Sequence, residues 1–264
     1  MTALLVYLAC GAFAGVLAGL LGVGGGIVIV PLLAIVFPWQ GVPAELVQLM
    51  ALGTSLASIV ITSVASSRAH HKRGAVRWDI WRSITPGIFV GTFLGGFLAA
   101  LLPTLFLKGF FVCFLFYVAI QMLLDLKPKA SRHLPGLPGM NAAGGIIGIV
   151  SSLVGIGGGS LSVPFMAWCN VPMHTAVGTS AAIGFPIAVA GAISYIWNGL
   201  GVANLPPYSL GYVSLSALFG LATASFFTAP LGAKLAHSLP VPKLKRFFAI
   251  FLLIMGTRML WNLF

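Results

Sequence analysis

Long apolar runs separated by short polar breaks constrain this chain more than any other feature of its sequence. They fill nearly all of the 264 residues, and only 6% of the residues are charged. A soluble domain carries about 25% charged residues, so this chain has too few to cover a surface in water. We therefore predict an all-α, multi-pass membrane protein, which excludes a soluble enzyme of the usual kind. The runs span residues 3–37, 43–67, 79–102, 107–126, 139–170, 174–197, 207–237 and 243–263.

The few charges are unevenly distributed. The chain has 14 Lys and Arg against 3 Asp and Glu, a formal net charge of +11, and the cations lie mainly in loops between the apolar runs. The positive-inside rule explains most of this excess without a nucleic-acid partner, and the remainder would attract an anionic substrate. Glu45, Asp79 and Asp125 lie near segment ends, which argues against a cation pump that relies on buried carboxylates.

The sequence contains no pattern that is typical of a cofactor site or of catalysis. Cys10, Cys113 and Cys169 fall in apolar runs without CxxC spacing, so they predict neither a disulfide nor a metal site. We find no P-loop and no catalytic triad. We therefore expect no cofactor, no metal and no enzymatic activity.

Three motifs occur twice, in the same order. GVGGGIVIVP (residues 22–31) matches GIGGGSLSVP (residues 155–164), and ALGTS (residues 51–55) matches AVGTS (residues 176–180). A third group of matches follows at a separation of 137 residues. Internal repeats are typical of secondary-transporter folds. The sequence thus predicts two repeats of about four membrane segments each.

The polar, Pro-rich stretch of residues 127–138 separates the two repeats. We expect a first transmembrane repeat at residues 1–126, a basic cytoplasmic linker, and a second repeat at residues 139–264. Cations cluster in residues 68–82, 127–132 and 243–246, which hold five, three and three of them. If the first and fifth runs enter and leave by one side, all three clusters are cytoplasmic and the repeats are inverted. We prefer this arrangement to eight full crossings with parallel repeats.

The first and fifth runs are too long for one straight span, and each contains a glycine cluster followed by a proline. Such a cluster breaks a membrane helix, and irregular backbone is tolerated there only inside protein or beside a wet cavity. A helix that restarts after the glycines points its free N–H groups and positive dipole end into the break. Two breaks that face each other near the midplane would form an anion site without a buried cation. The alternative is that the glycines only permit close helix packing.

The GTS triplets lie in the run that follows each break, where their hydroxyls would donate to a bound oxyanion. The alternative is a hydroxyl that bonds its own helix. We predict a substrate site formed by Gly24, Gly25, Gly26, Gly53, Thr54, Ser55, Gly157, Gly158, Gly159, Ser160, Gly178, Thr179 and Ser180.

Other candidates fit structural roles better. His174 has no counterpart in the first half, so loop packing is favoured over proton transfer. Arg258 and Lys234 lie toward segment ends, where long cationic side chains reach the interface. Gly87, Gly91 and Gly95 follow the small-xxx-small pattern of closely packed helices.

The doubled GxGGG-x4-Pro motif, with a GTS triplet after each copy, resembles the sulfite exporter TauE/SafE family of membrane permeases. The resemblance covers both halves, from GLLGVGGGIVIVPLL and ALGTSLASIV to GIVSSLVGIGGGSLSVPFM and AVGTSAAIGF. It implies a carrier in a bacterial-type plasma (inner) membrane for sulfite, sulfonates or related sulfur-containing anions.

We expect a secondary transporter that moves a small sulfur-containing oxyanion by alternating access, with export as the favoured direction. The partners would be this anion and the lipid bilayer, with no nucleic acid, and a homodimer is left open. An anion channel, an uptake permease for an organosulfur anion, and a membrane enzyme or assembly factor that handles sulfur are the alternatives.

Overall fold

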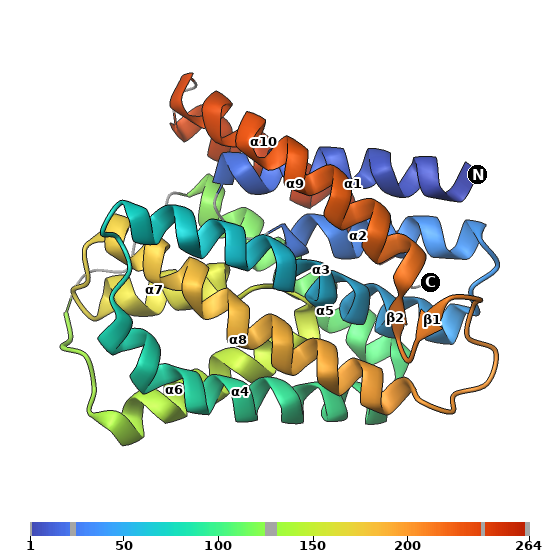
Figure 1. Cartoon of the computed structure of the whole chain (residues 1–264), viewed down its shortest axis with the longest axis horizontal. Coiled ribbons are helices and arrows are strands. Elements are labelled where there is room, and N and C mark those ends of the chain that lie inside the picture. The colour runs from blue at the N-terminus through green and yellow to red at the C-terminus, as the bar shows by residue number, and fades with distance from the viewer. Residues whose placement is uncertain (1, 22–24, 125–130, 239–240, 262–264) are drawn as a thin grey trace.

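The computed structural model describes residues 2–21, 25–124, 131–238 and 241–261 (Figure 1). Five of the described helices, α3, α4, α5, α6 and α8, are long and apolar enough to cross a membrane. The expected all-α polytopic fold is therefore confirmed. The elements are α1 (Thr2–Leu21), α2 (Gly26–Trp39), α3 (Ala44–Lys72), α4 (Trp78–Leu101), α5 (Thr104–Leu123), α6 (Leu137–Val154), α7 (Gly159–Trp168), α8 (Met173–Gly199), β1 (Ser209–Leu210), β2 (Val213–Ser214), α9 (Leu215–Ser238) and α10 (Val241–Trp261).

The first and fifth apolar runs each form two helices, with the division at the glycine cluster. The second division is described throughout: α6 ends before Gly155, which has φ +71°, and α7 begins after Gly158, which has φ +79°. Glycine adopts such left-handed conformations without the steric cost that a side chain imposes. Gly25 precedes α2 with φ +77°. The glycines therefore set where each helix stops and restarts.

Helices α3 and α8 pack against each other through the centre of the molecule. Gly53 lies against Tyr195, and Ser63, further along α3, lies against Gly184, earlier in α8. The two helices therefore run antiparallel. Each carries one copy of the GTS triplet, so two equivalent segments cross in opposite directions. Such a crossing is the arrangement that inverted halves require.

Helices α4 and α6 pack closely and run parallel, although they come from different halves. A Cβ on Gly87 would lie 2.0 Å from the carbonyl oxygen of Asn141, and one on Gly91 would lie 2.2 Å from that of Gly145. Only a residue without a side chain permits this approach of two backbones. The close-packing interpretation of Gly87, Gly91 and Gly95 is confirmed.

Helices α1 and α9 form the matching pair at the opposite side of the bundle (Figure 1). Gly11 lies against Leu221 and Gly15 against Ser225, so this pair is parallel as well. Three helices of the first half therefore pack on helices of the second half: α1 on α9, α4 on α6, and α5 on α10. The halves interlock. The domain boundaries at residues 126 and 139 stay a prediction.

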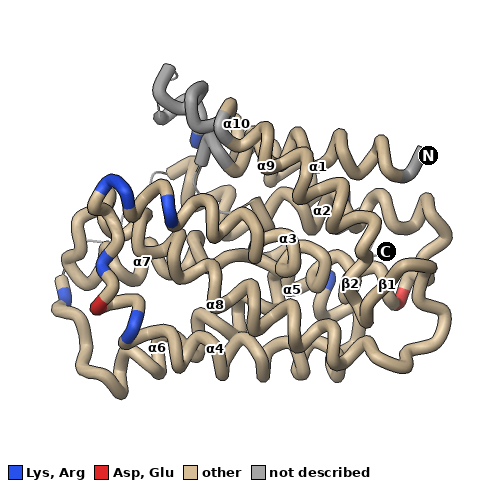
Figure 2. Tube along the Cα trace, in the orientation of Figure 1, with Lys and Arg blue, Asp and Glu red and all other residues tan. Residues whose placement is uncertain are grey.

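Lys and Arg gather at one end of the bundle, on the left in Figure 2, where α3 ends and α4 and α10 begin. Helix α3 is longer than its apolar run and continues through the start of the basic stretch to Lys72. This distribution of Lys and Arg is consistent with the prediction that the basic clusters lie on one side of the membrane. Lys127 and Lys129 of the linker lie outside the described residues.

A short hairpin of β1 and β2 precedes α9, which the sequence analysis did not predict. Its turn contains Gly211 with φ +55°, and the Tyr212 N–H donates to the Tyr195 carbonyl of α8 at 3.2 Å. Strands of two residues are too short for an alternating pattern to show in the sequence.

Candidate functional site

The two glycine breaks meet in the middle of the molecule. A Cβ on Gly26, at the start of α2, would lie 2.4 Å from the carbonyl oxygen of Gly155 and 3.0 Å from the Cα of Ile156. Ser55 of α3 donates a hydrogen bond to the same Gly155 oxygen at 2.8 Å. The contact between the first break, the second break and a GTS serine brings together three parts of the predicted site.

The start of α7 presents backbone donors. The N–H groups of Leu161 and Ser162 bond to the carbonyl of Gly158, and no side chain caps this helix. The N–H groups of Gly159 and Ser160 come before Leu161, the first residue whose N–H bonds within this turn, so they have no acceptor in the helix and can bind another group. The helix dipole adds positive potential at this point. This is the geometry of an anion site at a helix N-terminus.

Two serine hydroxyls beside this helix start are buried without a partner. Ser151 is 0% exposed and Ser160 is 9% exposed, and neither Oγ makes a hydrogen bond within the described part of the chain. A Cβ on Gly158 would lie 3.8 Å from the Ser151 Oγ, so this hydroxyl adjoins the break. Buried polar atoms normally have partners. A ligand that accepts hydrogen bonds would satisfy both hydroxyls.

The second GTS serine is linked to the same break. The Ser162 Oγ donates to the Gly158 carbonyl at 2.9 Å and lies 2.7 Å from the Ser180 Oγ. Since a hydroxyl has one hydrogen, Ser180 is the donor to Ser162. Ser55 and Ser180 thus both donate to protein acceptors, and an anion would have to replace those bonds.

The two GTS threonines hold the segments that lead into α9 and α4. Thr54 accepts the backbone N–H of Ser214 at 3.0 Å, and Thr179 accepts that of Arg77 at 3.0 Å. Both threonines are 0% exposed. Ser214 and Arg77 each directly precede a helix and are 137 residues apart. The same hydrogen bond therefore joins the halves twice.

The glycine of each triplet permits this docking. A Cβ on Gly53 would lie 2.8 Å from the Tyr212 carbonyl oxygen, and one on Gly178 would lie 2.5 Å from that of Ala75. Each connecting segment therefore passes directly over the glycine before its N–H reaches the threonine. The structure gives the Gly-Thr pairs this tertiary role, and their contact with an anion stays a prediction.

The remaining predicted positions divide between the two breaks. Gly25 caps α2, and its carbonyl accepts the N–H groups of Val28 and Ile29, both at 3.0 Å. Gly157 packs against Ile59, with 3.2 Å between a Cβ built on the glycine and the Ile59 Cγ2. Gly159 begins α7. Gly24 lies outside the described residues.

Sequence reasoning missed Ser151 and Ser162. Ser151 lies in an apolar run and ends up facing the break only because α6 stops a turn later at Gly155. A signal was present: the second motif contains serines at positions 160 and 162 where the first has Ile27 and Ile29. When one copy of an apolar motif contains serines that the other copy lacks, the copy with the serines is expected to form the polar break.

The remaining titratable candidates lie away from the helix breaks where they are described, and His174 lies on a helix rather than in the expected loop. His174 is exposed in the first turn of α8, where its Nε2 lies 3.1 Å from the Thr175 hydroxyl. Glu45 and Asp79 are exposed, and Asp125 lies outside the described residues. Residues 2–21, 25–124, 131–238 and 241–261 contain no group of three metal-ligating side chains.

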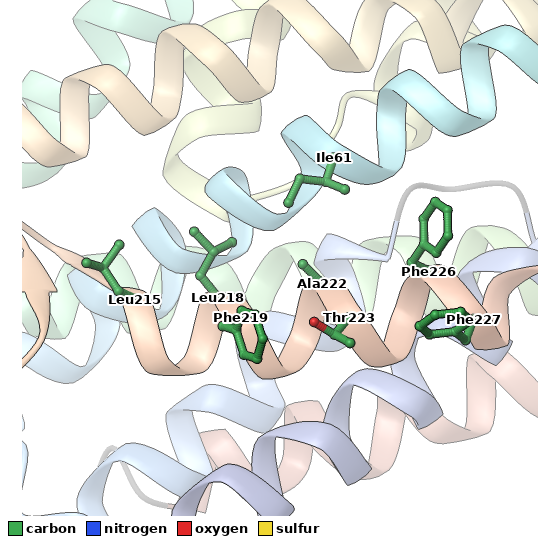
Figure 3. A pocket seen from close by; sticks show the side chains of 8 residues that line it. All are labelled: Ile61, Leu215, Leu218, Phe219, Ala222, Thr223, Phe226 and Phe227. Atoms are coloured by element: carbon green, nitrogen blue, oxygen red, sulfur yellow. The ribbon is translucent and has the colours of Figure 1, made fainter.

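A cavity of about 600 Å³ between α3 and α9 is unsuited to an anion (Figure 3). Thr223 is its one polar lining residue, beside Ile61, Leu218 and the aromatic rings of α9. Phe219 is 66% exposed and Phe227 is 70% exposed, so the cavity opens outward. In a bilayer this face of α9 meets hydrocarbon.

The chain is similar to known membrane transporters. A profile of the family described as sulfite exporter TauE/SafE matches residues 7–259. A probable membrane transporter protein of Haemophilus influenzae is 40% identical over 259 residues, which are 98% of each chain. A probable membrane transporter protein of Methanocaldococcus jannaschii is 31% identical over 256 residues, 95% of this chain and 92% of the relative. No solved structure matches this chain.

Proposed function

The chain belongs to the sulfite exporter TauE/SafE family, and from that membership we propose that it moves sulfite, sulfonates or related small sulfur-containing anions across the plasma membrane. The relatives are membrane transporters by name, which supports transport by this chain as well. We propose alternating access as the mechanism and export as its direction.

One observation carries the proposal. At the second break, the free N–H groups of a helix start lie beside two buried hydroxyls without partners, those of Ser151 and Ser160. All of these groups donate hydrogen bonds, and none carries a formal charge. A site of neutral donors binds an oxyanion and still releases it, whereas a buried cation would require a permanent partner. The chemistry therefore suits a transported anion.

The fold also supports movement around this site. The two breaks touch each other at Gly26 and Gly155, and both lie against α3. In transporters with repeats, one part rocks against the other around a central site made of broken helices. The interlocked pairs α1–α9 and α4–α6 supply two rigid parts for such a motion.

The test is flux of radiolabelled sulfite into and out of proteoliposomes, in competition with a panel of sulfonates. Ser160→Ala and Ser151→Ala remove one donor each, and a hydrogen bond to a charged group is worth about 1.5–3 kcal/mol. Affinity should fall roughly tenfold to a hundredfold. Ser225→Ala is the matched control, because this buried serine donates to its own helix at Ala222.

Sulfite flux that equals the flux through empty liposomes would contradict the proposal. Flux that does not saturate, or that far exceeds ~10³ per second, would identify a channel. Chemical change of the anion during the assay would identify an enzyme.

A further inference from the structure

Another cavity, which is partly polar and separate from the helix breaks, lies between the ends of α2, α3, α5 and α10. It has a volume of about 380 Å³, and its polar lining residues are Gln48 of α3, Lys108 of α5 and Arg258 of α10. The end of α2, including Pro38, forms another wall. Pro38 is 12 residues from Gly26 along α2, which corresponds to about 18 Å at a rise of ~1.5 Å per residue. The cavity is therefore distinct from the site at the breaks.

Gln48 is the first sign that this cavity receives a ligand. Its side chain is 0% exposed, and neither its amide nitrogen nor its amide oxygen has a hydrogen-bond partner in the described part of the chain. An unsatisfied buried amide is costly. A leucine at this position would avoid the cost, so the amide calls for a partner that enters the cavity.

The second sign is an excess of positive charge on the cavity wall. Lys108 is half-buried and Arg258 is exposed. Glu45 begins the same helix as Gln48, but its carboxylate pairs with neither cation. The one ion pair among the described residues joins Arg77 and Asp79 at the other end of the bundle. Within the described residues, neither Lys108 nor Arg258 forms an ion pair, and both line the same cavity.

The third sign is the location of these cations. Gln48 and Lys108 lie near the starts of α3 and α5, and Arg258 lies in the last turn of α10. These turns are at the end of the bundle opposite the gathered Lys and Arg, and Figure 2 shows an isolated basic stretch beside α5. The positive-inside rule disfavours cations at that end, so the rule does not explain their presence.

The rest of the lining is apolar and limits the kind of ligand. Ile35, Val42, Val47 and Met259 line the cavity together with the three polar side chains. Its volume lies within the range of small-molecule sites and exceeds what a bare oxyanion fills. A complementary ligand has an anionic head for the cations and the amide, and a short apolar part for the remaining walls.

We propose that this cavity is a second anion site, which binds an oxyanion that carries an apolar group. Lys108 and Arg258 bind the anionic oxygens, the Gln48 amide donates a further hydrogen bond, and the apolar walls take the chain. An alkylsulfonate from solution and the headgroup region of an anionic phospholipid share this chemistry. The proposal does not depend on the identity of the anion at the helix breaks.

The experiment uses the full chain in nanodiscs and measures thermal stability, because a ligand that binds the folded state raises the melting temperature as its concentration rises relative to its Kd. One arm titrates butanesulfonate into neutral phosphatidylcholine nanodiscs at constant ionic strength. The other arm replaces part of the phosphatidylcholine with phosphatidylglycerol and adds no sulfonate. A shift in the first arm that Lys108→Met or Arg258→Met reduces identifies a soluble anion as the ligand of this cavity, and such a shift in the second arm alone identifies a lipid.

Lys108→Met and Arg258→Met keep the apolar stem and remove the charge. Each should weaken binding at least ~10-fold in the arm that shows the shift. Gln48→Leu should leave the melting temperature unchanged or higher without the anion, and should reduce the shift with it. Arg82→Met removes an exposed cation at the other end of the bundle and is the matched control.

Equal shifts in wild type, Lys108→Met and Arg258→Met would overturn the proposal, as would the absence of a shift in both arms. Butanesulfonate also belongs to the class of anion proposed for the helix breaks, so binding at this cavity is measured as the difference in shift between wild type and Lys108→Met. This difference should persist when Ser151→Ala and Ser160→Ala are present in both proteins. The two proposals can fail separately. Failure of the transport proposal is seen as a lack of sulfite flux, whereas failure of the second-site proposal is seen as unchanged shifts in the Lys108 and Arg258 variants.

Discussion

In the two glycine-broken segments, the second helix starts with the same backbone geometry, but the side chains differ in chemistry. Gly25 and Gly158 precede their helices with φ +77° and +79°, and a proline follows five residues after each helix start. Ser160 and Ser162 then point polar groups into the second break, whereas the corresponding residues of the first are Ile27 and Ile29. The glycines thus build the same broken helix twice, and the side chains make only one of the two polar.

This difference teaches that backbone geometry and binding chemistry are separable in a repeated fold. The start of α2 meets the second break at Gly155, and the start of α7 adds N–H groups and dipole potential to the same break. One set of hydroxyls is then enough to orient an anion. Variants at the breaks and at the basic loop separate the two contributions.

The orientation of the halves gives an all-or-none prediction. If the halves are inverted, the basic stretch at residues 243–246 faces the cytoplasm together with residues 68–82. A single cysteine at Lys245, in a background without Cys10, Cys113 and Cys169, should react only with a reagent that enters the cell. Labelling from outside intact cells would show that the two halves are parallel.

Valine at either capping glycine should abolish anion binding. In Gly158→Val, φ near +79° strains a β-branched residue by ~1–3 kcal/mol, and a Cβ would lie 2.4 Å from the Ile187 Cδ1. Gly25→Val meets the same backbone strain. Sulfite binding by calorimetry should be lost in both variants while the protein still inserts.

Gly91→Val is the comparison variant, because it lies between α4 and α6 and away from both breaks. We expect it to lower yield and stability. Unchanged affinity in Gly25→Val and Gly158→Val would disprove a backbone anion site.

When side chains are exchanged between the breaks, only the loss of a serine from the second break should change anion affinity. Ser160→Ile removes a donor from the polar break, and the loss of about 1.5–3 kcal/mol corresponds to roughly tenfold to hundredfold weaker binding. Ile27→Ser adds a hydroxyl to the apolar break and should leave affinity within about threefold, since the second break already orients the anion. If Ile27→Ser strengthens binding as much as Ser160→Ile weakens it, the two breaks are chemically equivalent.

Thr54→Val and Thr179→Val should behave alike, in contrast to the serine exchange. Each leaves one buried backbone N–H, of Ser214 or Arg77, without its acceptor, which costs about 1–3 kcal/mol. Stability should therefore fall by a similar amount in both. If these hydroxyls also donate to the anion, affinity falls roughly tenfold as well. Denaturation measures the first effect and calorimetry the second, and a stability change in only one variant would contradict equivalent docking.

The smallest effect is expected at the basic loop. Lys72 and Arg73 are exposed at the end of α3, so charge removal should slow anion entry only at low salt, because charges are screened over ~8 Å at physiological ionic strength. Flux measured with Lys72→Gln and Arg73→Gln combined, at two salt concentrations, tests this. An affinity loss at high salt would place the substrate site in the loop.

The sequence by itself determined the features that depend on hydrophobicity and local backbone freedom. Apolar runs identified the helical membrane fold, because only a helix satisfies its own backbone within lipid. Glycine clusters located the helix breaks, since Gly25, Gly155 and Gly158 adopt positive φ. The spacing of Gly87, Gly91 and Gly95 predicted a close helix contact, although not its partner α6.

Only the tertiary structure decided which groups meet across the chain. Thr54 bonds to Ser214, 160 residues away, and Ser55 to Gly155, 100 residues away. No local pattern encodes such pairs, because they arise from the antiparallel crossing of α3 and α8 and from the interlocking of the halves. The same crossing engages the GTS serines with protein acceptors, whereas Ser151 and Ser160 at the break have no partner among the described residues. Gln48, near the start of α3, is buried beside α2, α5 and α10, and its amide has no hydrogen-bond partner in the described part of the chain.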